Sequence, residues 1–130
     1  MKISVGNSLR SEALAAVNFE RERRIAAFDR FVYDGTLFDG DATARQSIDA
    51  IARGVRLGLP LPDGFAWRAF DNTDVAMNAG QLLGLEAAML EAANRHRLRM
   101  HGIACSLKAL IAQAGSIEQV TALAWPDDPC

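Results

Sequence analysis

Residues 78–115 read NAGQLLGLEAAMLEAANRHRLRMHGIACSLKALIAQAG, and this stretch decides the fold because it predicts one long helix over residues 78–114. Apolar residues recur at alternating spacings of four and three, the repeat by which one helix face packs against another. Glu86 and His96 interrupt the repeat, and Gly102 lowers helix propensity by about 1 kcal/mol relative to Ala. The resulting apolar seam comprises Leu82, Glu86, Met89, Ala93, His96, Met100, Ile103, Leu107, Leu110 and Ala114.

The predicted length of this helix raises a question of size. At about 1.5 Å per residue the helix spans roughly 55 Å, whereas a compact chain of this length has a diameter of roughly 36 Å. Unless the helix breaks at Gly102, part of its apolar seam extends beyond the globule, and such an exposed stripe usually marks a protein interface. The sequence therefore predicts contacts between chains at Leu82, Met89, Met100, Ile103, Leu107, Leu110 and the terminal Cys130.

An amphipathic pattern near the start of the chain predicts a helix over residues 7–28. Asn7 and Ser8 are residue types that cap helix N-termini. Glu20 and Arg24 stand four apart, so they can pair on one helix face. The arginines of this segment alternate with glutamates, which favours a solvated helix face over an anion site.

The next segment, FVYDGTLF, predicts a β-hairpin over residues 31–38. Asp34 and Gly35 form a strong signal for a two-residue type I′ turn, in which both residues have positive φ. This turn sets Phe31 opposite Phe38, and opposed residues share a face, so the two rings form a cross-strand aromatic pair.

Two further helices are marked by their end signals. Asp41 is an N-cap candidate for a helix over residues 41–57, and Gly58 occupies the position where a helix-terminating glycine belongs. Ser116 is an N-cap candidate for a short terminal helix over residues 116–124.

The stretch FAWRAFDNTDVAM predicts a second hairpin over residues 65–77, with the turn formers between its strands. Asn78 and Gln81 then have the spacing of a capping box at the start of the long helix. Asp71 and Asp74 resemble an acid–base pair, but that role requires a nearby His, metal ligand or nucleophile, and none is near in sequence. We therefore interpret both aspartates as turn residues.

These elements predict a single α+β domain over residues 1–130. Two short hairpins pack with an N-terminal helix, a middle helix and a long C-terminal helix, and a short helix follows. The formal net charge of −2 gives no electrostatic footprint for nucleic acid. No apolar run is long enough to span a membrane, and the first residues lack the apolar core of a secretory signal, so we expect synthesis in the cytosol.

Histidine, cysteine and tryptophan side chains offer the remaining candidate sites. His101 and Cys105 are four apart and can share a helix face, but His96 is poorly spaced and a structural zinc site needs four ligands. Trp67 and Trp125 could stack on a sugar, although burial in a hairpin and against a helix end is the better interpretation. The sequence predicts no catalytic residue, no cofactor and no metal site.

The two cysteines do not form a disulfide framework. Cys105 lies in a helical pattern, where we expect it to pack as a small apolar side chain. For Cys130 an internal bridge, a free thiol and a bridge between chains all remain open.

The order of these segments resembles an uncharacterised domain of tail-fibre and tail-associated proteins of tailed bacteriophages and prophages. The resemblance runs from about Asn18 to Pro126. It is carried by Arg23-Arg24-Ile25, Tyr33, Gly35, Phe38, Asp41, Arg45, Ile48, Trp67, Asp71-Asn72, Val75, Met77, Leu107-Lys108 and Trp125-Pro126. No catalytic residue is implied by it.

The resemblance implies a small structural or connecting component of the tail, near the baseplate or tail fibres, that is not an enzyme. The implied partners are other tail proteins, copies of the same chain, or both, in an oligomer without nucleic acid. The protein would pass from the host cytoplasm into the virion. An alternative is a tail-fibre assembly chaperone that does not remain in the virion, and a remote alternative is a small hydrolase or carbohydrate-binding protein.

Overall fold

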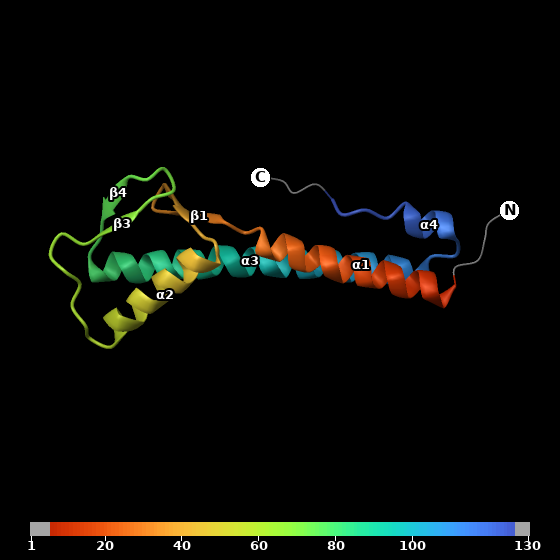
Figure 1. Cartoon of the computed structure of the whole chain (residues 1–130), viewed down its shortest axis with the longest axis horizontal. Coiled ribbons are helices and arrows are strands. Elements are labelled where there is room, and N and C mark those ends of the chain that lie inside the picture. Colours follow the sequence, from red (N-terminus) through yellow and green to blue (C-terminus); the bar gives the residue numbers. More distant parts are fainter. Residues whose placement is uncertain (1–5, 127–130) are drawn as a thin grey trace. The chain divides into compact units, whose positions relative to one another are not determined.

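The computed structural model describes residues 6–126 and has the predicted α+β architecture, with four helices and two antiparallel hairpins (Figure 1). Helices α1 and α4 end earlier than predicted. Within residues 6–126 no helix is long and apolar enough to cross a membrane. The elements are α1 (Asn7–Ala26), β1 (Arg30–Tyr33), β2 (Thr36–Asp39), α2 (Ala42–Arg56), β3 (Ala66–Arg68), β4 (Asp74–Ala76), α3 (Ala79–Gln113) and α4 (Ile117–Thr121).

The chain packs as two compact units, a division that the expectation of one domain did not include. Residues 26–96 form what we call the hairpin unit, which holds both hairpins, α2 and the first half of α3. Among the described residues, 6–25 and 97–126 form the helical unit, which holds α1 up to Ile25, the second half of α3 and α4. Each unit has its own cluster of buried apolar residues.

The first hairpin has the turn and register predicted from its sequence. Asp34 and Gly35 have φ values of 50° and 76°, as a type I′ turn requires. Phe31 pairs with Phe38 across the strands, and their ring centroids lie 5.9 Å apart. Both rings are buried, so this aromatic pair anchors the hairpin in the core.

The second hairpin is present as predicted, with the turn formers of residues 69–73 between its two strands. Trp67 pairs with Val75, and the backbone N–H of Ala69 donates to the carbonyl of Thr73 at 2.7 Å. The carboxylate of Asp71 accepts from the backbone N–H of Thr73 at 3.0 Å and from its hydroxyl at 2.6 Å. These bonds close an Asx turn, in which the aspartate side chain organises its own loop.

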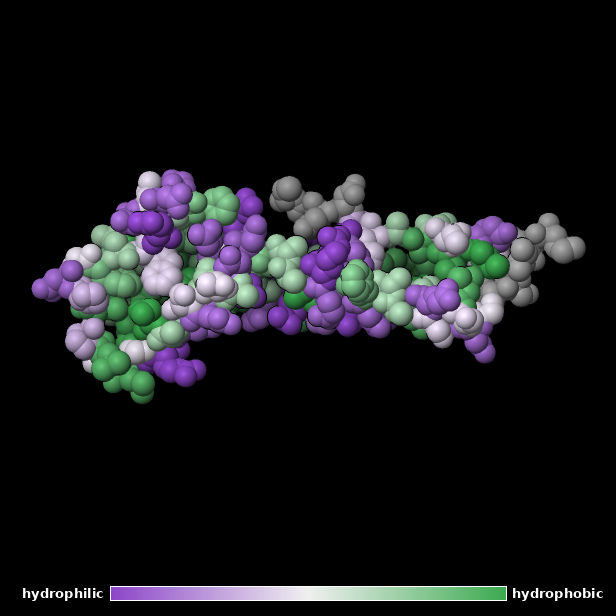
Figure 2. Space-filling view, viewed as in Figure 1, coloured by the Kyte–Doolittle hydropathy of each residue, from purple (hydrophilic) through white to green (hydrophobic). Residues whose placement is uncertain are grey.

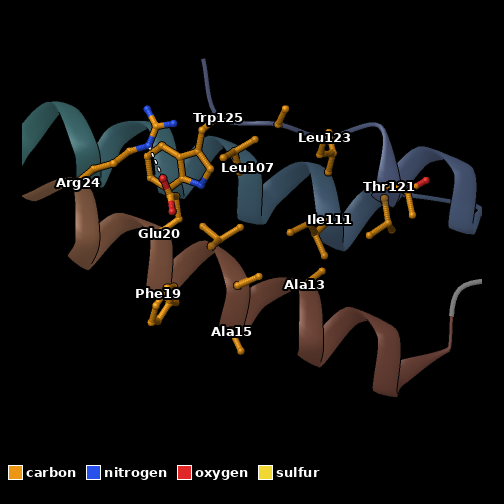
Figure 3. A pocket seen from close by; sticks show the side chains of 14 residues that line it. Ala13, Ala15, Phe19, Glu20, Arg24, Leu107, Ile111, Thr121, Leu123 and Trp125 are labelled. Carbon is orange, nitrogen blue, oxygen red and sulfur yellow. Dashed lines mark hydrogen bonds and ion pairs between the residues drawn. The ribbon is translucent and has the colours of Figure 1, made fainter. Parts of the chain in front are cut away.

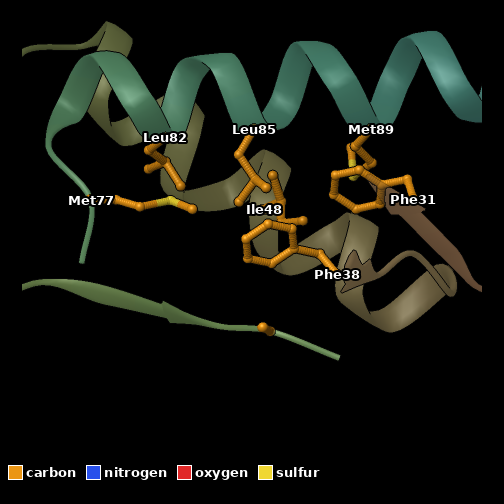
Figure 4. Packing of buried hydrophobic residues seen from close by; sticks show 8 residues of the cluster. Phe31, Phe38, Ile48, Met77, Leu82, Leu85 and Met89 are labelled. Atoms are coloured by element: carbon orange, nitrogen blue, oxygen red, sulfur yellow. The ribbon is translucent and has the colours of Figure 1, made fainter. Parts of the chain in front are cut away.

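The core of the hairpin unit lies where α2, α3 and both hairpins meet (Figure 4). Ile48 from α2, Leu82 from α3 and Phe38 from β2 are fully buried there. Figure 4 shows these side chains converging with Leu85 and Met89, which project from the same face of α3. The apolar face that α3 presents in this unit is therefore covered by its own chain.

The predicted cap of α2 and the predicted capping box of α3 are both present. The Asp41 carboxylate accepts from the backbone N–H of Ala44 at 2.8 Å at the start of α2. Asn78 and Gln81 exchange two side chain to backbone bonds, each of 2.8 Å, at the start of α3. At α4, the Ser116 hydroxyl accepts from a backbone N–H of the helix, as predicted.

A close approach in the hairpin unit involves Gly84 of α3. A Cβ atom at this position would lie 3.0 Å from Cζ of Tyr33, and closer still to the tyrosine hydroxyl. The absent side chain of Gly84 therefore makes room for the Tyr33 ring of β1 against the helix. No local sequence pattern indicates this contact, because the two residues are far apart along the chain.

The helical unit is built from α1, the second half of α3 and α4. Its buried cluster consists of Val17, Ala104, Leu107 and Ile111. The guanidinium of Arg10 donates to the carbonyls of Ile111 and Ala112 in the last turn of α3 and to that of Ala114 just after the helix, the latter two at 3.0 and 2.7 Å. A side chain from the start of α1 thus caps the C-terminus of α3.

Candidate functional site

An open apolar groove of about 830 Å³ crosses the helical unit (Figure 3). One wall is α1, the floor is α3, and the other wall is α4 with the segment that follows it. Ligand and peptide grooves of this size are common among binding proteins. The lining residues are Ala13, Ala15, Ala16, Val17, Phe19, Glu20, Arg24, Leu107, Ile111, Val120, Thr121, Leu123, Ala124 and Trp125.

The groove exists because α1 presents small side chains along this wall. Ala13 and Ala16 line the groove with side chains too small to fill it. On the floor, Leu107 and Ile111 are buried and supply an apolar surface. The result is a concave apolar surface that the chain itself leaves open.

One end of the groove is polar and is organised around Glu20. Nε of Arg24 and Nε of Arg23 each donate to the Glu20 carboxylate at 2.8 Å, which confirms the predicted Glu20–Arg24 pair. The guanidinium of Arg24 lies 5.0 Å over the Trp125 ring and donates to the carbonyl of Pro126 at 3.0 Å. Arg24 thus fixes the segment after α4 against α1.

These arginines also determine the charge of Glu20. Hydrogen bonds from Arg23 first, and then from Arg24, lower the pKa of Glu20 to about 2. Near neutral pH the carboxylate is ionised and both its oxygens accept hydrogen bonds, so it has no proton to donate as a general acid. The polar end of the groove therefore acts as a structural clamp.

The outer face of α1 beside the groove also exposes apolar surface. Phe19 is 73% exposed, an unusual state for a large aromatic side chain. Figure 3 shows Phe19 and Ala15 on the side of α1 away from Leu107 and Ile111. In the space-filling view, hydrophobic residues gather over the part of the surface where α1 and α4 lie (Figure 2).

The chemistry of the lining favours binding over catalysis. Among the 14 residues drawn in Figure 3, the titratable ones are Glu20 and Arg24, which pair with each other. The lining contains no His or Cys, and its one hydroxyl, that of Thr121, donates to the carbonyl of Glu118 at 3.2 Å. The groove therefore suits the apolar side chains of a partner protein.

The residues predicted to form an interface along α3 are mostly core residues of this chain. Leu82, Met89 and Met100 are buried in the packed core and form no free contact surface, whereas the buried Leu107 is part of the groove floor. Ile103 is half-buried against the helical cluster, Leu110 is 49% exposed, and Cys130 lies outside the described residues. Most of the seam that the periodicity identified is therefore buried, and Leu110 is its exposed member.

The other sequence candidates do not come together as a reactive site. Asp71 is engaged in its turn, and its bonds from Thr73 lower its pKa. Asp74 pairs with Arg68 at 3.4 Å on the surface. Trp67 and Trp125 are half-buried against their clusters, as interpreted from the sequence.

The candidate metal residues are dispersed on α3. His96 packs against the ring of Phe28 with centroids 5.6 Å apart, and His101 is exposed. Cys105 is free and exposed, so the expectation that it packs in the core is wrong. Within residues 6–126 no group of three His, Cys, Asp or Glu residues is placed to hold a metal ion.

The sequence did not predict that Glu86 and Asp49 lie together as a pair of carboxylates in the hairpin unit. Glu86, an interruption of the apolar seam, is buried and accepts from the guanidinium of Arg56 of α2, whose Nη2 lies 3.3 Å from Oε2. This bond lowers the pKa of Glu86, while burial and the hydrogen bond with Glu86 raise the pKa of Asp49. The interruption in the seam was the available signal, since a buried carboxylate requires a partner.

Comparisons with known proteins place most of the chain in one family of domains. The sequence profile of a family described as "Domain of unknown function (DUF4376)" matches residues 8–125. No protein with a curated description matches the chain. No solved structure matches it.

Proposed function

The chain belongs to the DUF4376 family of domains of unknown function, and from that premise we propose that it is a small structural or connecting component of a bacteriophage tail. Its place is the region of the baseplate or tail fibres, and it acts through protein–protein contacts. The tail assignment is supported by the order of motifs that resembles tail-associated proteins, from Arg23 to Trp125-Pro126.

The contact role is carried by one observation, the open apolar groove of the helical unit. Its walls are apolar, its paired Glu20 and Arg24 hold the structure together, and its lining includes no nucleophile with an adjacent base. Burial of such a surface against another protein is favourable by about 25 cal/mol per Å² of apolar area. The groove therefore supports a role in assembly, in which a tail protein occupies it and no reaction is catalysed.

Two substitutions at the segment after α4 test whether this groove holds the chain in the tail. Ala124 lines the groove and is exposed, so Ala124→Arg places a charged side chain in it. Ala122 is also exposed but lies outside the groove lining, so Ala122→Arg is the matched control. Phage particles are purified from cells that make each version, and the chain is quantified by mass spectrometry.

We expect wild type and Ala122→Arg to co-purify with tails and Ala124→Arg to be largely lost from them. A chain that binds fibre protein in the lysate but is absent from every purified particle is a chaperone, which replaces the proposed function. A chain found in neither fraction is not a tail component. Equal retention of Ala124→Arg and Ala122→Arg would show that the groove does not hold the chain in the tail.

A further inference from the structure

Helix α1 carries a second seam, on its outer face, that the elements within residues 6–126 leave largely uncovered. Its residues alternate in spacing by three and four, the repeat of residues that share one helix face. All are exposed except the first, which is half-buried. We call this the α1 seam, and it comprises Leu9, Glu12, Ala16, Phe19, Arg23 and Ala26.

The α1 seam has the same pattern in both directions along the helix. Counted from the N-terminal end, its first three residues are apolar, negatively charged and apolar. Counted from the C-terminal end, its first three residues are apolar, positively charged and apolar. An antiparallel copy related by a two-fold axis midway between Ala16 and Phe19 therefore meets a complementary surface. Self-complementarity of this kind is what a two-fold symmetric interface requires.

We propose that the helical unit forms a homodimer in which the α1 seams of two copies pack antiparallel. In this register each Phe19 lies level with Ala16 of the other copy, and each Glu12 lies level with Arg23 of the other copy. Leu9 and Ala26 meet at the two ends. The small side chain of Ala16 allows the helices to approach, and the exposed ring of Phe19 covers it.

Charge distinguishes this register from its neighbours. Among residues 6–126 Glu12 has no ion-pair partner, and the side chain of Arg23 is 60% exposed beside its bond to Glu20. If Phe19 instead lay level with Ala15 of the second copy, Glu12 would face Glu22, and like charges repel. One register thus satisfies both the aromatic contact and the charge pair.

The occupant of the α1 seam is therefore a second copy of this chain. Two Phe19 rings enter one symmetric contact, which concentrates the buried apolar surface near its centre, where hot spots of binding are found. The inference rests on the proposed contact function and specifies one of its partners. Ala16 and Phe19 also border the groove, whereas its residues on α4 and beyond, such as Ala124, lie outside the seam and remain for the tail partner.

The mass of the chain in solution tests the dimer directly. Sedimentation velocity is measured for wild type, for Phe19→Glu and for the control Leu98→Glu. Leu98 is a fair control because it lies on α3 of the same unit and is 70% exposed, close to the 73% of Phe19. Circular dichroism confirms that each variant is folded.

We expect a wild-type dimer, an unchanged Leu98→Glu dimer, and a dissociation constant for Phe19→Glu raised by roughly 30-fold or more, the effect of a lost hot spot. A monomeric wild type, a dimer unaffected by Phe19→Glu, or a dimer broken equally by Leu98→Glu would overturn the proposal. If wild type is a monomer yet co-purifies with tails, the dimer is wrong and the proposed function stands.

A charge exchange tests the register itself. Glu12→Arg and Arg23→Glu should each weaken the dimer by roughly tenfold, because each places like charges at the same level in both symmetric contacts. The double variant Glu12→Arg/Arg23→Glu restores the pair with its polarity reversed and should recover most of the affinity. A double variant as weak as the sum of the single variants would overturn this register.

Discussion

The hairpin unit and the helical unit share one long helix but differ in how completely they cover it. In the hairpin unit, aromatic and long aliphatic side chains such as Phe38, Ile48 and Leu82 close the core with no exposed surface of their own. In the helical unit, the buried cluster is small, and alanines on α1 leave a groove of about 830 Å³. The size of the side chains packed against α3 accounts for the difference between the large buried core of one unit and the groove of the other.

The largest expected effect is on the closed core. Phe38→Ala removes a fully buried ring and should lower the free energy of unfolding by about 3–5 kcal/mol, measured by urea denaturation. Val32 in the same hairpin is 61% exposed, so Val32→Ala should cost about 0.5 kcal/mol or less. Comparable losses for the two variants would show that the hairpin unit is not the closed half.

Removal of the cap that Arg10 of α1 forms at the C-terminus of α3 should have the next largest effect on stability. Arg10→Met removes the bonds to the last carbonyls of α3 and should cost about 2 kcal/mol, the range for hydrogen bonds from a charged group. The control Arg97→Met changes an exposed arginine of α3 and should have little effect. If both variants unfold at the same denaturant concentration, Arg10 is not a cap.

Alanine substitution at two glycines of α3 compares how tightly the two units pack against the same helix. Gly84→Ala should lower stability by about 1 kcal/mol, because displacing Tyr33 by overpacking outweighs the gain in helix propensity. Gly102 in the helical unit has nothing within 4 Å of its would-be Cβ, so Gly102→Ala should raise stability by about 1 kcal/mol.

The Gly84 effect has its own internal check. Tyr33→Phe removes the hydroxyl that lies closest to the new methyl group, so it should recover part of the loss in the double variant. A Gly84→Ala variant that is stabilised as much as Gly102→Ala would show that the Tyr33 ring does not pack against the helix.

The smallest effect at neutral pH is expected for Glu86→Gln, and it should depend on pH. Arg56 holds the pKa of Glu86 below its ordinary value, so the ionised carboxylate stabilises the fold above the pKa of the unfolded chain. This stability is lost as the pH falls through the folded-state pKa. The gap in the free energy of unfolding between wild type and variant should therefore be full at pH 7 and begin to shrink once the pH falls below about 4.3, the ordinary pKa of a glutamate.

Asp49 contributes with the opposite sign, because its raised pKa favours the fold at low pH. The part of this shift that comes from burial is present in both proteins, whereas the part that comes from Glu86 is altered in Glu86→Gln. A gap in the free energy of unfolding that stays constant from pH 7 to pH 3 would contradict the bond between Arg56 and Glu86.

The elements that the sequence predicted are those that neighbouring residues determine. The turn at Asp34-Gly35, the cap at Asp41 and the capping box of Asn78 and Gln81 each act within four residues, so their signals survive without tertiary information. The Gly84–Tyr33 approach and the Arg10 cap join residues far apart in the chain. Such contacts depend on the packed fold and leave no local pattern.

The predicted interface along α3 shows why periodicity alone does not identify a free surface. The repeat through Leu82, Met89 and Met100 identified an apolar face correctly, but periodicity does not say what covers that face. The α1 seam was missed for the opposite reason, because alanine and charged residues such as Ala16 and Arg23 dilute its apolar signal. Which face remains open becomes visible only after the chain's own packing is known.

Hydrogen exchange tests the central contrast between the closed and the open unit most directly. Wild type is compared with Phe19→Glu at one protein concentration, and exchange is followed by peptide along the chain. We predict slower exchange in wild type for amides of α1, residues 9–26, and equal exchange in β3, β4 and the first half of α3. Equal exchange along α1, or protection confined to the hairpin unit, would contradict the account.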